Sequence, residues 1–226
     1  TTFHGRAQIL FGIDLKVERG QVVALLGRNG AGKSTTLKSI MGLVRPSGGE
    51  VTFDGRPLRG LKPHQIARLG LGYVPEERRI FTGLSVAENL EVGRQPPRPG
   101  VPEWTPERVY GLFPNLGEIR ERPGGRISGG EQQMLTIART LMGNPATILL
   151  DEPSEGLAPK IIDEMALMIG DLKAEGLTVL LAEQNMRFAP RVADRVHVLE
   201  TGYVRWHGTT AAFIADDAAQ RRFLMA

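Results

Sequence analysis

The chain has 226 residues, of which 41% are hydrophobic and 23% charged, and its formal net charge is +3. This composition predicts a globular protein with a substantial core and excludes a disordered chain. The small positive excess does not by itself indicate nucleic-acid binding. The lack of cysteine excludes a disulfide framework and a thiolate metal site. The longest apolar stretches, at 146–150 and 177–182, are shorter than the roughly 18 residues of a membrane span, and no signal peptide is visible, so we expect a cytoplasmic protein.

Short β-branched runs alternate with longer segments of helical period, which predicts an α/β fold with a mainly parallel sheet covered by helices. Helix boundaries are marked by local signals, such as Pro63 at the start of one helix and Gly70 just past its end. In chain order we expect a strand at 21–26, a glycine-rich turn at 27–32, a helix at 33–41, a hairpin arm at 50–55, a helix at 63–69, strands at 71–74, 147–150, 178–182 and 195–199, and helices at 159–175 and 186–193.

Between residues 82 and 145 the strand signal disappears and helix starts take its place. Ser85 and Ser128 each stand three positions before a glutamate, which is the pattern of a capping box. The simplest interpretation is a helical lobe inserted between strands. We therefore expect a single domain over 1–226, with a core at about 1–81 and 146–208, a helical subdomain at about 82–145 and a C-terminal helical tail at about 209–226.

The strongest functional signal is a glycine-rich loop between a predicted strand and a predicted helix. It matches the pattern G-x-x-x-x-G-K-[ST] with the residues Gly27, Arg28, Asn29, Gly30, Ala31, Gly32, Lys33 and Ser34. In such a loop the backbone N–H groups and the helix N-terminus face phosphate oxygens, the lysine reaches the β- and γ-phosphates, and the serine hydroxyl coordinates Mg²⁺. The alternative is a glycine-rich turn without a ligand, and Arg28 and Asn29 fit loop filler as well as ligand contacts.

Two adjacent carboxylates, Asp151 and Glu152, end the apolar strand at 147–150. A strand in this position can deliver both to the carboxyl edge of the sheet. Asp151 would hold Mg²⁺ or its water, and Glu152 would orient or deprotonate a water that attacks the γ-phosphate. Without the phosphate loop, a solvated strand end would explain the pair equally well.

A third motif, Ser128-Gly129-Gly130-Glu131, opens an amphipathic helix. The apolar face of that helix is marked by Met134, Ile137, Ala138 and Leu141. Ser128 and Glu131 would cap the helix, but two consecutive glycines cost helix stability and leave bare N–H groups that can meet an anion. Capping and contact with a phosphate are compatible.

These three motifs, in this order, resemble the ATP-binding cassette (ABC) ATPases over essentially the whole chain. The resemblance implies a RecA-like P-loop NTPase core with an antiparallel β arm, an inserted helical subdomain, and ATP and Mg²⁺ as cofactors. In the family, the Ser-Gly-Gly segment of one subunit closes over the nucleotide held by another, so two ATP molecules lie in a head-to-tail dimer. By this resemblance, Ser128, Gly129, Gly130 and Glu131 contact the partner's nucleotide.

Within the family, Tyr73-Val-Pro-Glu76 and Ala182-Glu-Gln-Asn185 resemble the ATP-binding subunits of branched-chain amino acid importers of the LivF type. Glu76 stands where most cassettes carry a Mg²⁺-contacting Gln, and Gln184 stands where most carry a His that contacts the γ-phosphate. Gln184 cannot become a cation near neutral pH, so Glu152 carries more of the base assignment. By the same resemblance Thr35 belongs to the ATP site and His4 stacks on adenine. A frayed terminus would explain His4 equally well, and loop residues without a role remain the alternative for Glu76 and Gln184.

The resemblance also implies partners and a location. We expect a second ABC ATPase subunit, in a homodimer or a heterodimer with a LivG-like chain, together with transmembrane permease subunits. A solute-binding protein would act indirectly, and nucleic acid is not expected. The chain would then sit peripherally on the cytoplasmic face of the inner membrane and hydrolyse ATP to drive import of branched-chain or other hydrophobic amino acids. Importers of urea or short amides, and a non-transport ABC switch, remain alternatives.

Overall fold

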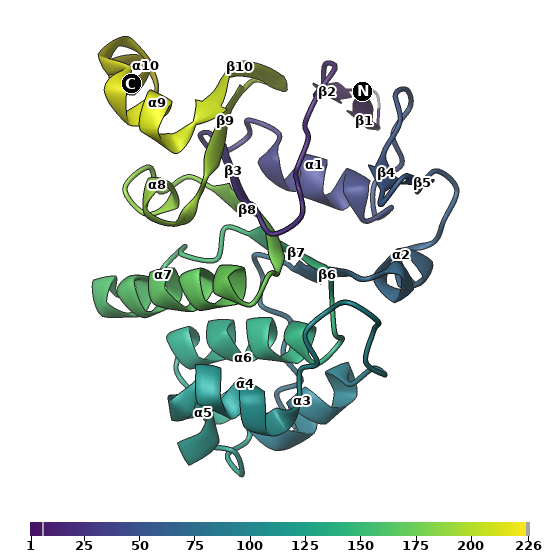
Figure 1. Cartoon of the computed structure of the whole chain (residues 1–226), viewed down its shortest axis with the longest axis vertical. Helices are drawn as coiled ribbons and strands as arrows, with labels where there is room; N and C mark the ends of the chain where they lie inside the picture. Colours follow the sequence, from purple (N-terminus) through teal and green to yellow (C-terminus); the bar gives the residue numbers. More distant parts are fainter. Residues whose placement is uncertain (6, 225–226) are drawn as a thin grey trace.

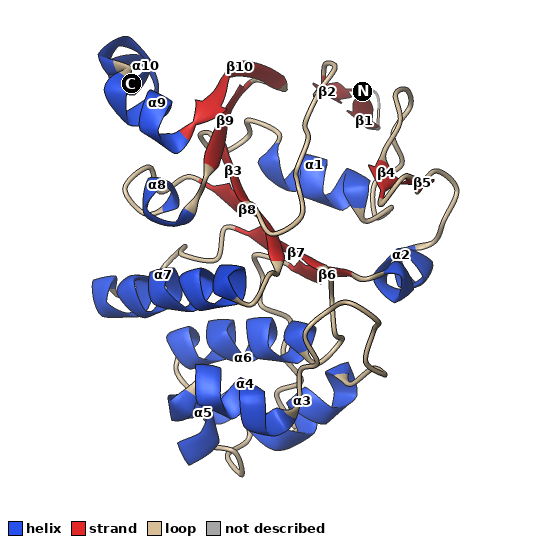
Figure 2. Cartoon of the chain, in the orientation of Figure 1, coloured by secondary structure: helices blue, strands red, loops and turns tan. Residues whose placement is uncertain are grey.

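A six-stranded sheet forms the centre of the computed structural model, which describes residues 1–5 and 7–224 (Figures 1 and 2). The strand order is β10-β9-β3-β8-β7-β6, in which β10 is antiparallel to β9 and all other neighbours are parallel. The strands are β3 (Val22–Leu26), β6 (Leu71–Val74), β7 (Thr147–Asp151), β8 (Thr178–Glu183), β9 (Arg195–Glu200) and β10 (Tyr203–Thr209). The predicted α/β class with a mainly parallel sheet is confirmed.

Helices cover both faces of this sheet, which explains why its parallel strands are continuous apolar runs. On one face lie α1 (Lys33–Ile40) and α2 (Pro63–Leu69), and on the other α7 (Pro159–Ala174), α8 (Ala189–Val192) and the helices of the predicted lobe (Figure 1). Alternate residues of β3 divide between the two cores: Val22 and Leu26 face α7 and the lobe, whereas Val23 and Leu25 face α1. All of β3 is therefore buried.

The segment from 82 to 145 contains helices and no strand, and the structure describes every residue of it. It comprises α3 (Val86–Gly93), α4 (Pro106–Leu112), α5 (Pro114–Glu118), a short 3-10 turn (Gly124–Arg126) and α6 (Gly129–Leu141). The two predicted capping boxes both form: Glu88 N donates to Ser85 Oγ at 3.1 Å and Glu131 N donates to Ser128 Oγ at 3.2 Å. The division of the chain into a core and a helical subdomain stays a prediction.

Two short antiparallel strand pairs and a C-terminal helical segment complete the fold. A hairpin arm was expected at 50–55 and a helical tail at about 209–226, so of these elements only the strand pair at the N-terminus was not expected. Short antiparallel pairs form the arm beside α1: β1 (Thr2–His4) with β2 (Ala7–Leu10), and β4 (Thr52–Phe53) with β5 (Arg56–Pro57). After β10 the chain ends in α9 (Thr210–Ala215) and α10 (Asp217–Leu224). No helix among the described residues is long and apolar enough to cross a membrane.

One expected helix is shorter than predicted, and one strand was not predicted. The helix expected at 186–193 is only α8, because the Asn185 side chain accepts hydrogen bonds from Arg187 N and Phe188 N at 3.1 Å each and so forms a turn before it. The strand β10 was not expected, because as an edge strand it alternates between exposed and half-buried residues and has no apolar run.

Candidate nucleotide site

The loop between β3 and α1 has the geometry of an anion cradle. Gly30 and Gly32 have φ values of 80° and 106°, in the left-handed region that favours glycine. A Cβ at Gly27 would lie 2.5 Å from the backbone oxygen of Leu199, so only glycine fits there. No side chain caps the start of α1, which leaves the first N–H groups of this helix available to an anion.

Lys33 links the loop to the carboxylates at the end of β7. Its Nζ donates to the backbone oxygens of Gly27 at 2.8 Å and Arg28 at 3.1 Å, and it pairs with Glu152 Oε1 at 2.9 Å. The lysine side chain is 3% exposed and the glutamate 9%. Glu152 is therefore not a solvated strand end. The positive charge of Lys33, which would contact a phosphate, is neutralised here by Glu152, the residue expected to act as the base.

Asp151 is fully buried, and both of its carboxylate oxygens accept a hydrogen bond. Oδ1 accepts from Ser34 Oγ at 2.8 Å, and Oδ2 accepts from the Tyr73 hydroxyl at 2.9 Å. Burial, followed by the negative charge of Asp151, raises the pKa of Tyr73, so the phenol remains a donor. Tyr73 is a site residue that sequence reasoning missed, since a tyrosine in a strand gives no local sign of a contact with a second strand.

Glu76 follows β6 at the same edge of the sheet and is exposed. Its pKa is raised first by partial burial and then by the carboxylates of Glu155, Glu152 and Asp151. No group of three His, Cys, Asp or Glu side chains in the described part of the chain could hold a metal alone. The oxygen donors of Ser34, Asp151 and Glu76 nevertheless fit Mg²⁺, which keeps several waters and needs only one or two carboxylates beside the phosphates.

The backbone around Glu152 is held in an unusual conformation. Its φ is 47°, in the left-handed region that is costly for a residue with a side chain. Glu152 N donates to Ala182 O of β8 at 2.9 Å, so the strained residue is held by the neighbouring strand. Gln184 lies in the turn after β8, is exposed, and makes no side-chain hydrogen bond within the described residues.

Glu183, the residue before Gln184, is a second buried acid that sequence reasoning missed. It is only 2% exposed, and burial raises its pKa although hydrogen bonds from Ser154 and Asn185 oppose that shift. In the sequence it lies at the end of an apolar run, where an acid resembles an ordinary exposed strand end. Only the spatial arrangement of β7 and β8 reveals its partners.

The Ser-Gly-Gly segment lies at the N-terminus of α6, apart from the phosphate loop. Gly129 lies under the guanidinium of Arg78 and Gly130 against the side chain of Ile161, so a Cβ at either position would be crowded. Among the hydrogen bonds and ion pairs of residues 1–5 and 7–224, none joins Ser128, Gly129, Gly130 or Glu131 to the phosphate loop. One chain does not bring these two motifs together.

The remaining predicted ligand residues occupy different environments. Arg28, Asn29 and Gly30 are exposed at the tip of the phosphate loop, Ala31 is buried, and Thr35 is half-buried in the first turn of α1. His4 ends β1, but its side chain lies outside the described residues, so its predicted contact with adenine stays a prediction.

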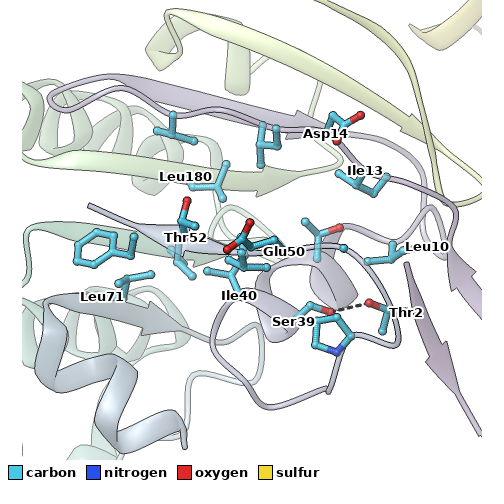
Figure 3. Close-up of a pocket in the computed structure, with 18 of the residues that line it drawn as sticks. Thr2, Leu10, Ile13, Asp14, Ser39, Ile40, Glu50, Thr52, Leu71 and Leu180 are labelled. Atoms are coloured by element: carbon cyan, nitrogen blue, oxygen red, sulfur yellow. Dashed lines mark hydrogen bonds between the residues drawn. The ribbon is translucent and has the colours of Figure 1, made fainter. Parts of the chain in front are cut away.

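A separate cavity of about 390 Å³ lies between the arm, α1 and the sheet (Figure 3). Leu71, Thr147 and Thr178, which line it, are the first residues of β6, β7 and β8. The cavity is thus at the amino ends of the strands, and the buried side chains of Ser39 and Thr2, which also line it, are hydrogen-bonded at 3.1 Å. Ligands of open α/β sheets bind at the carboxyl ends, where the phosphate loop lies, so this cavity is not part of the nucleotide site.

Comparison with known proteins connects this geometry to a family. Residues 10–155 match the family model of the ABC transporter. The chain is 42% identical over 224 residues to the high-affinity branched-chain amino acid transport ATP-binding protein BraG of Pseudomonas aeruginosa, with 99% of this chain and 96% of the relative covered. It is 35% identical over 219 residues to the lipopolysaccharide export system ATP-binding protein LptB of Haemophilus influenzae, with 96% and 91% covered.

A solved structure gives the same result at the level of the fold. The structure of a nucleotide-free ATP-binding cassette from an ABC transporter matches this chain with a TM-score of 0.83 and 25% identity, covering 98% of this chain and 93% of that one. The family model matches well over half of the sequence, and both relatives are more than 30% identical across nearly the whole chain. The chain therefore belongs to the ABC transporter family and is one of its ATP-binding, ATP-hydrolysing subunits.

Proposed function

We propose that this subunit energises an importer of branched-chain or other hydrophobic amino acids. The observation that carries ATP hydrolysis in this proposal is the linked set of contacts from Lys33 and Ser34 to Glu152 and Asp151, which joins a phosphate cradle to a candidate base. The substrate class is supported by the higher identity to BraG, at 42%, than to the export protein LptB, at 35%.

In the proposed mechanism the N–H groups of the phosphate loop and of the start of α1 bind the phosphates of ATP. Mg²⁺ held by Ser34, Asp151 and Glu76 would neutralise charge on the phosphate oxygens. Lys33 breaks its ion pair with Glu152 and forms one with the terminal phosphate instead. The carboxylate of Glu152 is then free to accept a proton from the attacking water, and Gln184 can donate a hydrogen bond to the γ-phosphate.

The proposed site is completed by a second subunit. In the part of the chain that the structure describes, the N-terminus of α6 makes no hydrogen bond with its own phosphate loop, and Ser128 is exposed while Gly129, Gly130 and Glu131 are half-buried, so this segment can meet a nucleotide bound elsewhere. We infer a head-to-tail dimer, with an identical chain or a LivG-like chain, in which each ATP lies between one phosphate loop and the other subunit's Ser-Gly-Gly segment. The rate of hydrolysis per subunit should therefore rise with protein concentration. A constant rate at concentrations where the chain is monomeric would exclude the shared site.

The proposed contact with the permease is the hollow between α2, α3 and α6, which has a volume of about 630 Å³. Three large apolar side chains are exposed at its edge: Leu43 at 52%, Phe81 at 47% and Val92 at 52%. Exposed apolar groups around a hollow are typical of a protein-binding surface. This contact would hold the chain peripherally at the cytoplasmic face of the membrane. Replacing Phe81 by Ser should reduce copurification with the permease and leave hydrolysis by the isolated chain unchanged.

Reconstitution tests the transported solute. The chain is placed with its permease and solute-binding protein in vesicles that contain ATP and Mg²⁺, and uptake of labelled leucine, phenylalanine, urea and acetamide is measured. We expect ATP-dependent uptake of the amino acids. Uptake of urea or the amide alone would support the related importer instead. ATP hydrolysis without a permease partner in the cell would support a non-transport switch.

A further inference from the structure

The carboxylate of Glu183 connects two loops at the nucleotide edge of the sheet. Glu183 is the last residue of β8 and is 2% exposed. Its Oε1 accepts a hydrogen bond from Ser154 N at 2.9 Å, and its Oε2 accepts one from Asn185 N at 3.0 Å. Each oxygen therefore holds the backbone of a different loop, one following β7 and one following β8.

These two loops carry the residues proposed to act at the terminal phosphate. Ser154 is two positions after Glu152, and Asn185 directly follows Gln184. The backbone of β8 adds two further links, because Gly27 N donates to Glu183 O at 3.3 Å and Glu152 N donates to Ala182 O at 2.9 Å. The end of β8 thus connects the phosphate loop, the base and the turn with Gln184.

A carboxylate is a costly group for anchoring a loop at this position. Burial disfavours its charge, and the carboxylate of Glu152 nearby adds to that cost. An ionised carboxylate is, however, the side chain that can accept from two N–H groups on opposite sides without donating to either. An amide of the same shape would point an NH₂ group at one of the two backbone donors.

We propose that Glu183 is a positioning residue for ATP hydrolysis, whose carboxylate fixes the loop after Glu152 and the turn with Gln184 relative to the phosphate loop. This role rests on the proposed function of Glu152 and Gln184. It requires that the two hydrogen bonds set the geometry of hydrolysis and contribute little to nucleotide binding, since the phosphate cradle is formed by other residues.

The variant Glu183→Gln tests this role with almost no change in shape. We expect kcat for ATP hydrolysis to fall by about 10–100-fold, because a displacement of about 1 Å in a catalytic group costs this much, while KM for ATP changes less than threefold. The control is Thr178→Val at the opposite end of β8, which removes the partly buried hydrogen bond from Gly20 N to Thr178 Oγ1, 2.9 Å long. The control should lower the melting temperature and leave kcat unchanged.

A spectroscopic readout separates positioning from stability. In ¹H–¹⁵N spectra of the full chain, the amide signals of Ser154 and Asn185 should shift in Glu183→Gln and remain in place in Thr178→Val. If Glu183→Gln does not fold, Glu183→Asp keeps the charge, withdraws it by one methylene and should also lower kcat at constant KM. Unchanged kcat in a folded Glu183 variant, or equal losses of kcat in the variant and the control, would overturn the proposal.

The proposed function is tested separately by Glu152→Gln in the same assay. If Glu152→Gln retains hydrolysis, the base assignment fails, whereas the shifts of the Ser154 and Asn185 amides still report whether Glu183 holds both loops. If Glu152→Gln loses hydrolysis and Glu183→Gln does not, the base assignment stands and the positioning role of Glu183 is refuted.

Discussion

The change Glu152→Gln tests both the base assignment and the ion pair with Lys33. Glutamine keeps an oxygen that can accept from Nζ, but it loses the charge of a pair that is 2.9 Å apart, with partners 3% and 9% exposed. A hydrogen bond between charged groups contributes about 1.5–3 kcal/mol and a neutral one about 0.5–1.5 kcal/mol, so the loss is about 1 kcal/mol. For a chain of this size that lowers the melting temperature by about 2–4 °C without nucleotide.

The effects on ATP are expected in opposite directions. In the variant, Lys33 does not have to break an ion pair with a carboxylate before it contacts the phosphate. The free energy of about 1 kcal/mol that this pair contributed without nucleotide should therefore strengthen ATP binding by about fivefold to tenfold. Hydrolysis should fall by about 10²–10⁴-fold, since that is the contribution of a positioned general base. ATP binding without turnover should also let the closed dimer accumulate.

Three measurements on one preparation check this prediction. Phosphate release gives kcat, titration with a fluorescent ATP analogue gives affinity, and light scattering with and without ATP gives the dimer fraction. The matched control is Glu200→Gln, because Glu200 also ends a strand of the sheet and pairs with arginines, Arg205 at 3.6 Å and Arg222 at 3.3 Å. A Glu152→Gln protein that hydrolyses ATP within tenfold of the natural chain would refute the base assignment.

Other changes probe the neighbouring contacts. Tyr73→Phe removes one of the two hydrogen bonds to Asp151. Because the loss of a group that orients a metal ligand weakens metal binding, the Mg²⁺ concentration for half-maximal hydrolysis should rise by about tenfold. An unchanged Mg²⁺ dependence would contradict this. Lys33→Ala leaves the Glu152 carboxylate buried without its partner, so the free energy of unfolding should drop by about 3–5 kcal/mol and ATP binding should be lost in the titration. The pKa of Glu76 is raised on folding, so at pH values between the ordinary carboxyl pKa and the raised pKa the folded chain binds more protons than the unfolded chain. The free energy of unfolding therefore falls as the pH rises through this range. Mg²⁺ at Glu76 should therefore raise the melting temperature more at about pH 8 than at about pH 5, and equal increases would contradict its role as a ligand.

Local chemistry explains which parts of the fold could be predicted. The bounds of α2 and β6 follow from Pro63 and Gly70, and both capping boxes form as the sequence pattern requires. The phosphate loop was predictable for the same reason, since its glycines and its lysine act within a few residues of one another. Signals of this kind need no knowledge of the rest of the chain.

Long-range pairing explains what could not be predicted. The hydroxyl of Tyr73 meets Asp151 only because β6 and β7 are adjacent, and Glu183 meets Ser154 only because β7 and β8 are. The edge strand β10 depends on pairing with β9 and has no apolar pattern of its own. Sequence reasoning therefore identified the groups expected to touch ATP and missed the groups that hold those residues in place.

The parallel sheet explains why separate motifs form one site. The carboxyl ends of β3, β6, β7 and β8 lie at one edge, so the residues that follow each strand come together regardless of their distance in the sequence. The Ser-Gly-Gly segment is the exception, because it opens a helix of the lobe and not a loop after a strand. In the proposed head-to-tail dimer, the same topology would complete the phosphate-binding half of the site within one chain and leave the other half to a second chain, and closure of that pair would be the motion that hydrolysis couples to a permease.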